Sequence, residues 1–299
     1  MEIGLVDLFD GSAERDLAFM RDFSQTAEEL GFTGIWLPEH LVFFEQYDSV
    51  YPYPAAPSAS DPERTEVHNK VEDGKARVEA AQDQGLLDVA MAAATVLGFT
   101  ERLRIGSSVL LLPTRNVRLF ARELMTLSAL TGDRFDLGVG VGWAAEEFQA
   151  AGSPFRIRGM RSEQNLGELD RLWAADDEGL VLPDPRPARP RILVGGHSPA
   201  AIRRAATVAG GWYPWNLTPS QFGEHHASFR DQAAEAGKDV DALHAVAGFR
   251  FLGAWDQLPD LVDRYAAHGA DGVNLSLRMT TENYVETMQS ISDALGLVA

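Results

Sequence analysis

Residues 103–141 read LRIGSSVLLLPTRNVRLFARELMTLSALTGDRFDLGVGV and contain one complete strand–helix–strand unit. The apolar runs at 103–112 and 135–141 lack regular alternation with polar residues, which is typical of parallel strands covered on both faces. Between them, residues 117–131 carry apolar side chains at helical spacing. A unit of this kind predicts an α/β fold built on a parallel sheet.

The same alternation of strand and helix extends over the rest of the chain. Further strands are predicted at 2–8, 34–38, 191–195, 211–215, 244–252 and 271–277. Further helices are predicted at 15–30, 86–98, 161–174, 199–209, 220–236, 257–268 and 281–296. Eight strands that alternate with helices in 299 residues predict a single-domain TIM (β/α)8 barrel over residues 1–299. A doubly wound open sheet is the alternative fold, because connectivity alone does not show that a sheet closes.

Two segments depart from a minimal barrel. Residues 45–85 form a long insertion after the second strand, with Tyr-Pro repeats followed by charged residues. Insertions at the C-terminal ends of barrel strands often carry function, so we expect either a lid near the active site or a surface excursion. Residues 176–190 are rich in proline and charge and are expected to act only as a connector.

Composition narrows the partners and the location of the protein. The net charge of −18 argues against nucleic acid and anionic membrane surfaces, which bind basic patches. The sequence has no apolar run long enough for a membrane span, and its acidic N-terminus does not resemble a secretory signal. The chain has no cysteine, which excludes disulfides and thiolate chemistry. We therefore expect a cytoplasmic protein that acts on a small molecule.

The second predicted strand ends in Pro38, Glu39 and His40, at the edge of a barrel where function collects. A histidine at this edge suits general acid–base work or a hydrogen bond to an anionic ring. The alternative is a structural Glu–His pair that closes the strand. In the third strand, the small residues at 106–108 would let a flat ligand approach the backbone, although tight core packing explains them equally well.

The fifth predicted strand leads into a loop with the features of a phosphate site. Ser198 is a good N-cap, Pro199 fits the first helical turn, and Gly195 and Gly196 allow close approach of the backbone. A helix that opens from a glycine loop binds phosphate or carboxylate through its free N–H groups and its dipole. We therefore expect a phosphate at residues 195–201, with a merely well-capped helix as the alternative.

The remaining histidines do not form a metal-binding motif. His225 and His226 are adjacent within a helical stretch, His68 lies in the insertion, and His244 and His268 lie at the ends of predicted elements. The sequence contains no H-x-H or HExxH motif and no Asp/His cluster at ligand spacing. It therefore predicts no metal site.

The glycines at 138, 140 and 142 do not form a dinucleotide-binding fingerprint. That fingerprint needs Gly-x-Gly-x-x-Gly after the first strand of its unit, whereas here the third glycine comes one residue early. Three predicted strands also precede it. We interpret GVGVGW at 138–143 as a barrel strand thinned by glycines so that a flat ligand can lie against its end.

Residues 103–152 and 191–212 together resemble the bacterial-luciferase-like flavin and deazaflavin oxidoreductases. The upstream segments GFTGIWLPEH and DSVYPYP also fit, so the resemblance covers most of the chain. Its most specific part is GVGVGWAAEEF at 138–148, which looks most like the branch that uses coenzyme F420. The resemblance implies a TIM barrel with a tricyclic cofactor ring in its mouth and a cis peptide at Ser108–Val109 behind the ring.

The resemblance also implies roles for individual residues. The acid at Glu39 would contact the cofactor, and His40 would act as the proton donor. The other cofactor-binding residues that it implies are Ser107, Ser108, Val109, Val141, Gly142, Trp143, Glu146, Gly195, Gly196, His197, Ser198, Ala200 and Ala201.

One position departs from the family pattern. Sugar-phosphate dehydrogenases of the F420 branch have a catalytic glutamate directly after the glycine of the fourth strand, where this chain has Trp143. This departure argues against a glucose-6-phosphate-type reaction. An indole at this place fits a flatter or more apolar substrate, a wall beside the cofactor ring, or a core filler.

The preferred function is an F420-dependent oxidoreductase that moves a hydride between the deazaflavin and a small organic substrate. The alternative with the same fold is an FMNH2-dependent two-component monooxygenase, which would need a cofactor-reducing enzyme as partner. A non-enzymatic flavin-binding barrel is the third alternative. A homodimer is left open, since relatives often form dimers.

Overall fold

The computed structural model describes residues 1–7, 9, 14–44, 47–50, 55–57, 65–67, 69–72, 75–78, 86–174, 183, 185–277 and 279–298. Parallel strands pair in sequence around a closed barrel, since β9 pairs with β10 and β13 pairs back with β1. The barrel strands are β1 (Glu2–Val6), β2 (Gly34–Leu37), β7 (Arg104–Ser107), β9 (Phe135–Gly140), β10 (Arg191–Gly195), β11 (Gly211–Tyr213), β12 (His244–Arg250) and β13 (Gly272–Ser276). The predicted TIM barrel is therefore confirmed, and the open sheet is wrong.

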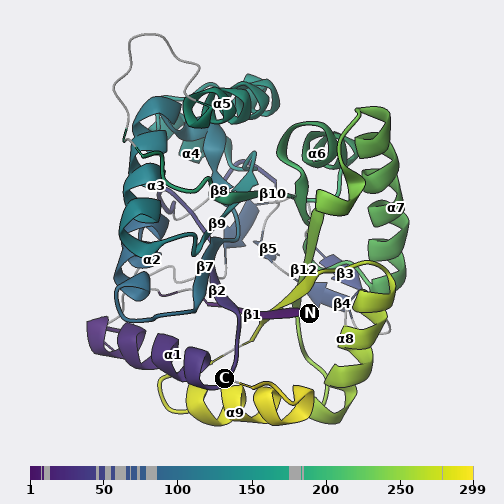
Figure 1. Cartoon of the computed structure of the whole chain (residues 1–299). Coiled ribbons are helices and arrows are strands. Elements are labelled where there is room, and N and C mark those ends of the chain that lie inside the picture. The colour runs from purple at the N-terminus through teal and green to yellow at the C-terminus, as the bar shows by residue number, and fades with distance from the viewer. Residues whose placement is uncertain are drawn as a thin grey trace.

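Helices form a ring around these strands (Figure 1). The ring contains α1 (Leu17–Glu29), α2 (Val89–Leu97), α3 (Val117–Thr131), α5 (Arg158–Trp173), α6 (Pro199–Arg204), α7 (Pro219–Glu235), α8 (Leu258–Ala267) and α9 (Tyr284–Leu295). Several begin where a side chain accepts a backbone N–H of the first turn, which satisfies a donor that the helix leaves unpaired. These N-caps are Asp16, Asp88, Asn116, Ser198 and Thr218.

Shorter elements follow the barrel strands. The helix α4 (Ala145–Ala150), which the sequence did not predict, lies after β9. The 3-10 turns are η1 (Leu112–Thr114), η2 (Phe155–Ile157), η4 (Val240–Ala242) and η5 (Trp255–Gln257), and α6 continues as a π-helical segment, η3 (Ala205–Ala209). The predicted strand at 103–112 divides into β7 and β8 (Leu110–Leu111), and the Ser108–Val109 peptide between them is cis, as the resemblance implies.

The insertion contains two antiparallel strand pairs. One pair is β3 (Ala55–Pro57) with β4 (Thr65–Val67), and the other is β5 (Asn69–Glu72) with β6 (Lys75–Val78). Most other residues of 45–85, together with 176–182 and 184 of the expected connector, lie outside the described residues. The lid therefore stays a prediction.

Large aromatic residues fill the barrel interior. The ring centroids of Trp36 and Tyr213 lie 4.9 Å apart, and both side chains are buried. Glycines make the room for them: a Cβ at Gly106 would lie 2.4 Å from Cε3 of Trp36. The barrel is thus a packed core rather than a pore.

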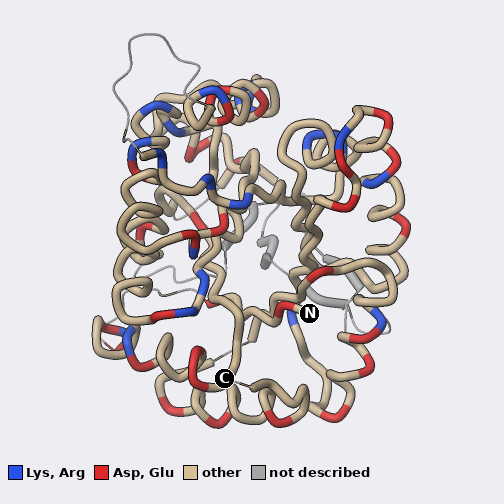
Figure 2. Tube along the Cα trace, viewed as in Figure 1, with Lys and Arg blue, Asp and Glu red and all other residues tan. Residues whose placement is uncertain are grey.

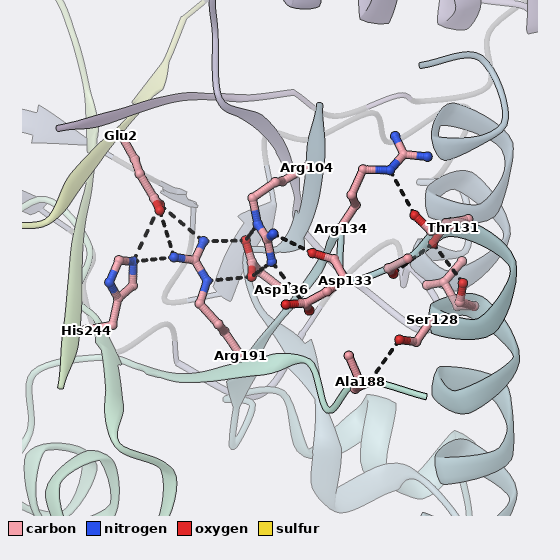
Figure 3. A network of polar contacts seen from close by, with 12 residues as sticks. Glu2, Arg104, Ser128, Thr131, Asp133, Arg134, Asp136, Ala188, Arg191 and His244 are labelled. Carbon is pink, nitrogen blue, oxygen red and sulfur yellow. Dashed lines mark hydrogen bonds and ion pairs between the residues drawn. The ribbon is translucent and has the colours of Figure 1, made fainter. Parts of the chain in front are cut away.

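A network of ion pairs closes the N-terminal end of the barrel (Figure 3). Asp136 accepts two hydrogen bonds from Arg104, at 2.7 and 2.9 Å, and two from Arg191, both at 2.8 Å. Arg191 also donates to Glu2 at 2.7 and 3.1 Å, and Nε2 of His244 lies 2.9 Å from Nη1 of Arg191 and 3.4 Å from Oε2 of Glu2. These residues come from β1, β7, β9, β10 and β12, so the network ties distant parts of the chain together.

Charge on the outer surface is distributed over the helical ring. Figure 2 shows Asp and Glu along the surrounding helices, with Lys and Arg between them. Among the described residues, charged positions of both signs therefore follow the helical ring. No helix in the described part of the chain is both long and apolar enough to cross a membrane.

Candidate functional site

The candidate site lies at the C-terminal ends of four successive barrel strands. Glu39 and His40 follow β2, Ser108 and Val109 follow β7, residues 141–146 follow β9, and residues 196–201 follow β10. These strands are neighbours in the barrel, with β2 paired to β7, β7 to β9 and β9 to β10. The fold therefore brings the segments that the sequence predicted to one edge of the barrel.

Glu39 is directed toward the third strand segment. Its Oε2 accepts a 2.6 Å hydrogen bond from the Leu111 N–H, and Arg115 donates to its Oε1. Burial raises the pKa of the Glu39 carboxyl, and the charge of Arg115 with the Leu111 hydrogen bond offsets this only in part. Both carboxylate oxygens thus already have partners within the chain.

His40 turns to a different partner. Its Nδ1 lies 2.8 Å from Oε1 of Glu147, and Oε2 of the same carboxylate accepts a 2.9 Å hydrogen bond from the Leu41 N–H. Glu147 comes from α4 and is buried, whereas the His40 side chain is 17% exposed. Glu39 and His40 therefore do not bind each other, because each side chain binds a different neighbour.

Aromatic side chains stand beside His40. The ring of Phe43 lies 5.1 Å and that of Trp143 6.3 Å from the imidazole, measured between centroids. Trp143 also packs against Tyr47 at 5.2 Å, and Tyr47 is almost fully buried. Trp143 is half-buried at the edge of this cluster, so it forms an aromatic wall next to the imidazole.

Glu146 anchors the start of the insertion. Its Oε1 accepts hydrogen bonds from the N–H groups of Asp48 at 2.7 Å and Ser49 at 2.9 Å, while the Ser49 hydroxyl accepts from the Ala145 N–H. Burial opposes ionisation of Glu146, but hydrogen bonds from its own backbone N–H, from Ser49 and from Asp48 outweigh it and lower the pKa of the carboxyl. The second oxygen, Oε2, is buried and has no hydrogen-bond partner.

The residues around the cis peptide belong to a polar cluster inside the barrel. The Ser108 hydroxyl lies 2.9 Å from the Tyr213 hydroxyl, which also hydrogen-bonds to Asn274. Burial raises the pKa of Tyr213 to about 12. Ser107 is fully buried and donates to the Gly138 carbonyl at 2.7 Å, so its hydroxyl binds the neighbouring strand β9 of the barrel.

The glycines of β9 make room for this chain itself. A Cβ at Gly138 would lie 1.9 Å from the Ser107 carbonyl oxygen, and one at Gly140 would lie 2.5 Å from Cγ2 of Val109. This differs from the expected role of leaving space for a ligand ring, because the space is already filled. Gly142 adopts φ +71°, and its carbonyl accepts a 3.1 Å hydrogen bond from Arg158.

The loop after β10 has the predicted capping geometry. The Ser198 hydroxyl accepts the Ala201 N–H at 3.2 Å, which confirms Ser198 as N-cap and occupies one of the expected anion donors. Gly196 has φ +93°, and its carbonyl accepts a 2.8 Å hydrogen bond from the Trp212 indole. Burial lowers the pKa of His197, whose ring stacks 5.9 Å from that of His225. Ala200 is exposed at the start of α6.

Several residues of the site were missed by sequence reasoning. Glu147, Phe43, Tyr213 and Arg115 all contact predicted residues. The adjacent Glu146 and Glu147 could have indicated a second site residue. Neighbouring side chains on a helix point about 100° apart, so the two carboxylates reach different partners. Among the described residues, no group of three or more His, Asp or Glu side chains could hold a metal ion.

The comparisons with known proteins agree with this fold. A family model described as luciferase-like monooxygenase matches residues 73–284, and the chain belongs to this family. An uncharacterised protein of Mycobacterium tuberculosis is 31% identical over 236 residues, which cover 76% of this chain and 75% of that protein.

Two solved structures share the fold at low sequence identity. One is an F420-dependent secondary alcohol dehydrogenase in complex with an F420–acetone adduct, with a TM-score of 0.73 and 13% identity over 98% of both chains. The other is a monooxygenase from Streptomyces bottropensis, with a TM-score of 0.73 and 18% identity over 99% of this chain and 98% of that one. The chain is thus a member of the luciferase-like monooxygenase family, and it shares its fold with an F420-dependent dehydrogenase and with a monooxygenase.

Proposed function

We propose that this protein is an F420-dependent oxidoreductase that interconverts a small carbonyl compound and its alcohol. The observation that carries the proposal is the imidazole of His40, held at the barrel edge by the buried Glu147. Hydride transfer to a carbonyl carbon must be matched by a proton on the carbonyl oxygen. A positioned histidine is the group most often used for such a transfer.

The described residues fit a deazaflavin or flavin. The buried Oε2 of Glu146 lacks a partner and would accept a hydrogen bond from a ligand hydroxyl or N–H. Ser108 and Val109 would hold the ring, Val141 and Gly142 its edge, and Gly195, Gly196, His197, Ser198 and Ala200 the phosphate. The half-buried Arg158 donates to the Gly142 carbonyl and would add a positive charge near the edge of the ring.

The chain's own residues would then divide the work. When bound, the deazaflavin supplies or accepts the hydride. His40 would give its proton to the substrate oxygen in reduction and take it back in oxidation. Leu111 and Arg115 already bind both carboxylate oxygens of Glu39. Glu39 would therefore contact the cofactor only with the edge of its own side chain. Trp143 and Phe43 would exclude water and select a flat, apolar substrate.

A titration of the apoprotein with F420 and FMN side by side tests the cofactor. Quenching of intrinsic fluorescence is the readout, and we expect micromolar binding of F420 with much weaker binding of FMN. Micromolar FMN binding without F420 binding would overturn the proposal. It would favour the two-component monooxygenase, which needs FMNH2 from a partner reductase.

A second assay tests the reaction. The absorbance of oxidised F420 should fall when an apolar secondary alcohol is added with F420, and it should rise when a ketone is added with reduced F420. Oxygen consumption should not accompany turnover, because a deazaflavin does not readily activate oxygen. Sugar phosphates serve as the contrasting substrates, which the wall of Trp143 and Phe43 should reject.

A further inference from the structure

Whether Nε2 of His40 carries a hydrogen depends on the residue that binds Nδ1. Both oxygens of Glu147 are engaged, one with Nδ1 of His40 at 2.8 Å and the other with the Leu41 N–H at 2.9 Å. A backbone N–H can only donate, so it fixes one carboxylate oxygen as its acceptor. The other oxygen is then held against Nδ1 in a defined direction.

We infer that Glu147 is a positioning residue that fixes the tautomer and orientation of His40, so that Nε2 is the nitrogen that exchanges the proton. A carboxylate only accepts hydrogen bonds, hence Nδ1 must carry the hydrogen. Nε2 has no hydrogen-bond partner among the described residues, and His40 remains partly exposed. In histidines, the hydrogen bond made by one ring nitrogen commonly decides whether the other nitrogen carries a hydrogen.

The surroundings of the pair support a fixed geometry. Glu147 is 1% exposed on α4, and the imidazole is bordered by the rings of Phe43 and Trp143. The neighbouring Glu146 points to Asp48 and Ser49 instead, so the two adjacent carboxylates have separate tasks. This inference rests on the proposed function only for the use of Nε2 in turnover; the tautomer itself is a property of the free protein.

The substitution Glu147→Gln provides a sharp test, because the glutamine must place its oxygen toward the Leu41 N–H. Its NH2 group then faces Nδ1 and donates to it, which forces the hydrogen of a neutral ring onto Nε2. Nitrogen-15 NMR of histidine-labelled protein reads this directly, with His40→Ala used to assign the signals. We expect a protonated Nδ1 in the unaltered protein and an unprotonated Nδ1 in Glu147→Gln.

Glu146→Gln is the matched control, since it removes the adjacent charge on the same helix without touching His40. It should leave the nitrogen-15 signals of His40 unchanged. An unprotonated Nδ1 in the unaltered protein, or the same signals in Glu147→Gln, would overturn the inference.

Turnover separates this inference from the proposed function. Glu147→Gln should lower turnover about 10²–10⁴-fold with little change in cofactor affinity, by analogy with other carboxylate–histidine pairs. Glu147→Asp keeps the charge and should recover part of the loss. A changed tautomer with unchanged turnover would overturn the role of Nε2 in the reaction, while failure of F420 binding would overturn only the proposed function.

Discussion

The two ends of the barrel use polar groups in opposite ways. At the N-terminal end, Asp136 is held by two guanidinium groups, and Arg191 also binds Glu2. At the C-terminal end, Oε2 of Glu146 is buried without a partner, and Nε2 of His40 has none among the described residues. The first arrangement stabilises the fold, whereas the second leaves hydrogen-bonding capacity for a ligand.

The pKa shifts also differ between the two ends of the barrel. At the N-terminal end, burial alone would raise the pKa of Glu2, but hydrogen bonds from His244 and Arg191 outweigh it and lower that pKa to about 2. At the C-terminal end, burial dominates and raises the pKa of Glu39 and of Tyr213. Paired charges thus hold the network in its ionised form. At the candidate site, burial favours the protonated form of Glu39 and Tyr213, whereas hydrogen bonds favour the ionised form of Glu146.

The largest expected effect separates function at one end from stability at the other. His40→Ala should lower turnover about 10²–10⁴-fold, because it removes the proposed proton donor. His244→Ala at the opposite end should leave turnover unchanged and lower the free energy of unfolding by about 1 kcal/mol. Steady-state kinetics and urea denaturation measure the two quantities. Equal turnover in His40→Ala and the unaltered protein would remove His40 from the mechanism.

Breaking the network should have the largest effect on stability. Asp136→Asn leaves the guanidinium groups of Arg104 and Arg191 without their shared carboxylate, which should lower the free energy of unfolding by about 3–5 kcal/mol. Urea denaturation measures this loss. Asp133→Asn is the control, since that carboxylate is exposed and lies 3.9 Å from Arg104, and it should cost less than about 1 kcal/mol. Similar losses in both variants would contradict the distinction.

Acid should weaken the N-terminal end first. The pKa of Glu2 in the folded state, about 2, lies below its ordinary value of 4.5, so the folded state binds fewer protons than the unfolded chain in this window. Its contribution to stability is present above pH 4.5 and is lost as the pH falls toward 2. Stability curves of Glu2→Gln should decline less steeply over this range. Parallel curves for the two proteins would show that Glu2 does not contribute.

The sequence predicted the barrel well because its strands are continuous apolar runs with helices between them. Predicted strands at 135–141 and 191–195 agree with β9 and β10 almost to the residue. The break of the third strand at Ser108–Val109 follows no local apolar pattern, and only the family resemblance indicated it. The six-residue α4 is too short to show helical periodicity in the sequence.

The candidate site was predictable by segment but not by contact. Residues at strand ends come together because the barrel aligns all C-terminal ends, and this placed Glu39, Ser108 and Ser198 correctly at one edge. The contacts between side chains depend on the direction in which each side chain points. The spacing of residues along the sequence does not determine these directions. Glu39 and His40 are adjacent in sequence, yet one binds Arg115 and the other Glu147.

The smallest expected effect concerns the barrel interior beneath the site. Tyr213→Phe removes the hydroxyl that hydrogen-bonds to Ser108 and Asn274, which should lower stability at neutral pH by about 1 kcal/mol. The pH dependence is more diagnostic. Because the folded-state pKa of about 12 exceeds the ordinary value of 10.0, the folded protein keeps a proton that the unfolded chain loses in this window.

The contribution of the Tyr213 hydroxyl is therefore fully present below pH 10 and is lost as the pH rises toward 12. Urea denaturation of both proteins between pH 8 and 11 measures the difference, since all other titrating groups are shared. We expect the two stability curves to converge as the pH rises. A constant separation would mean that the Tyr213 proton is not held more tightly in the folded barrel, and the contrast between an acid-sensitive N-terminal end and an alkali-sensitive interior would fail.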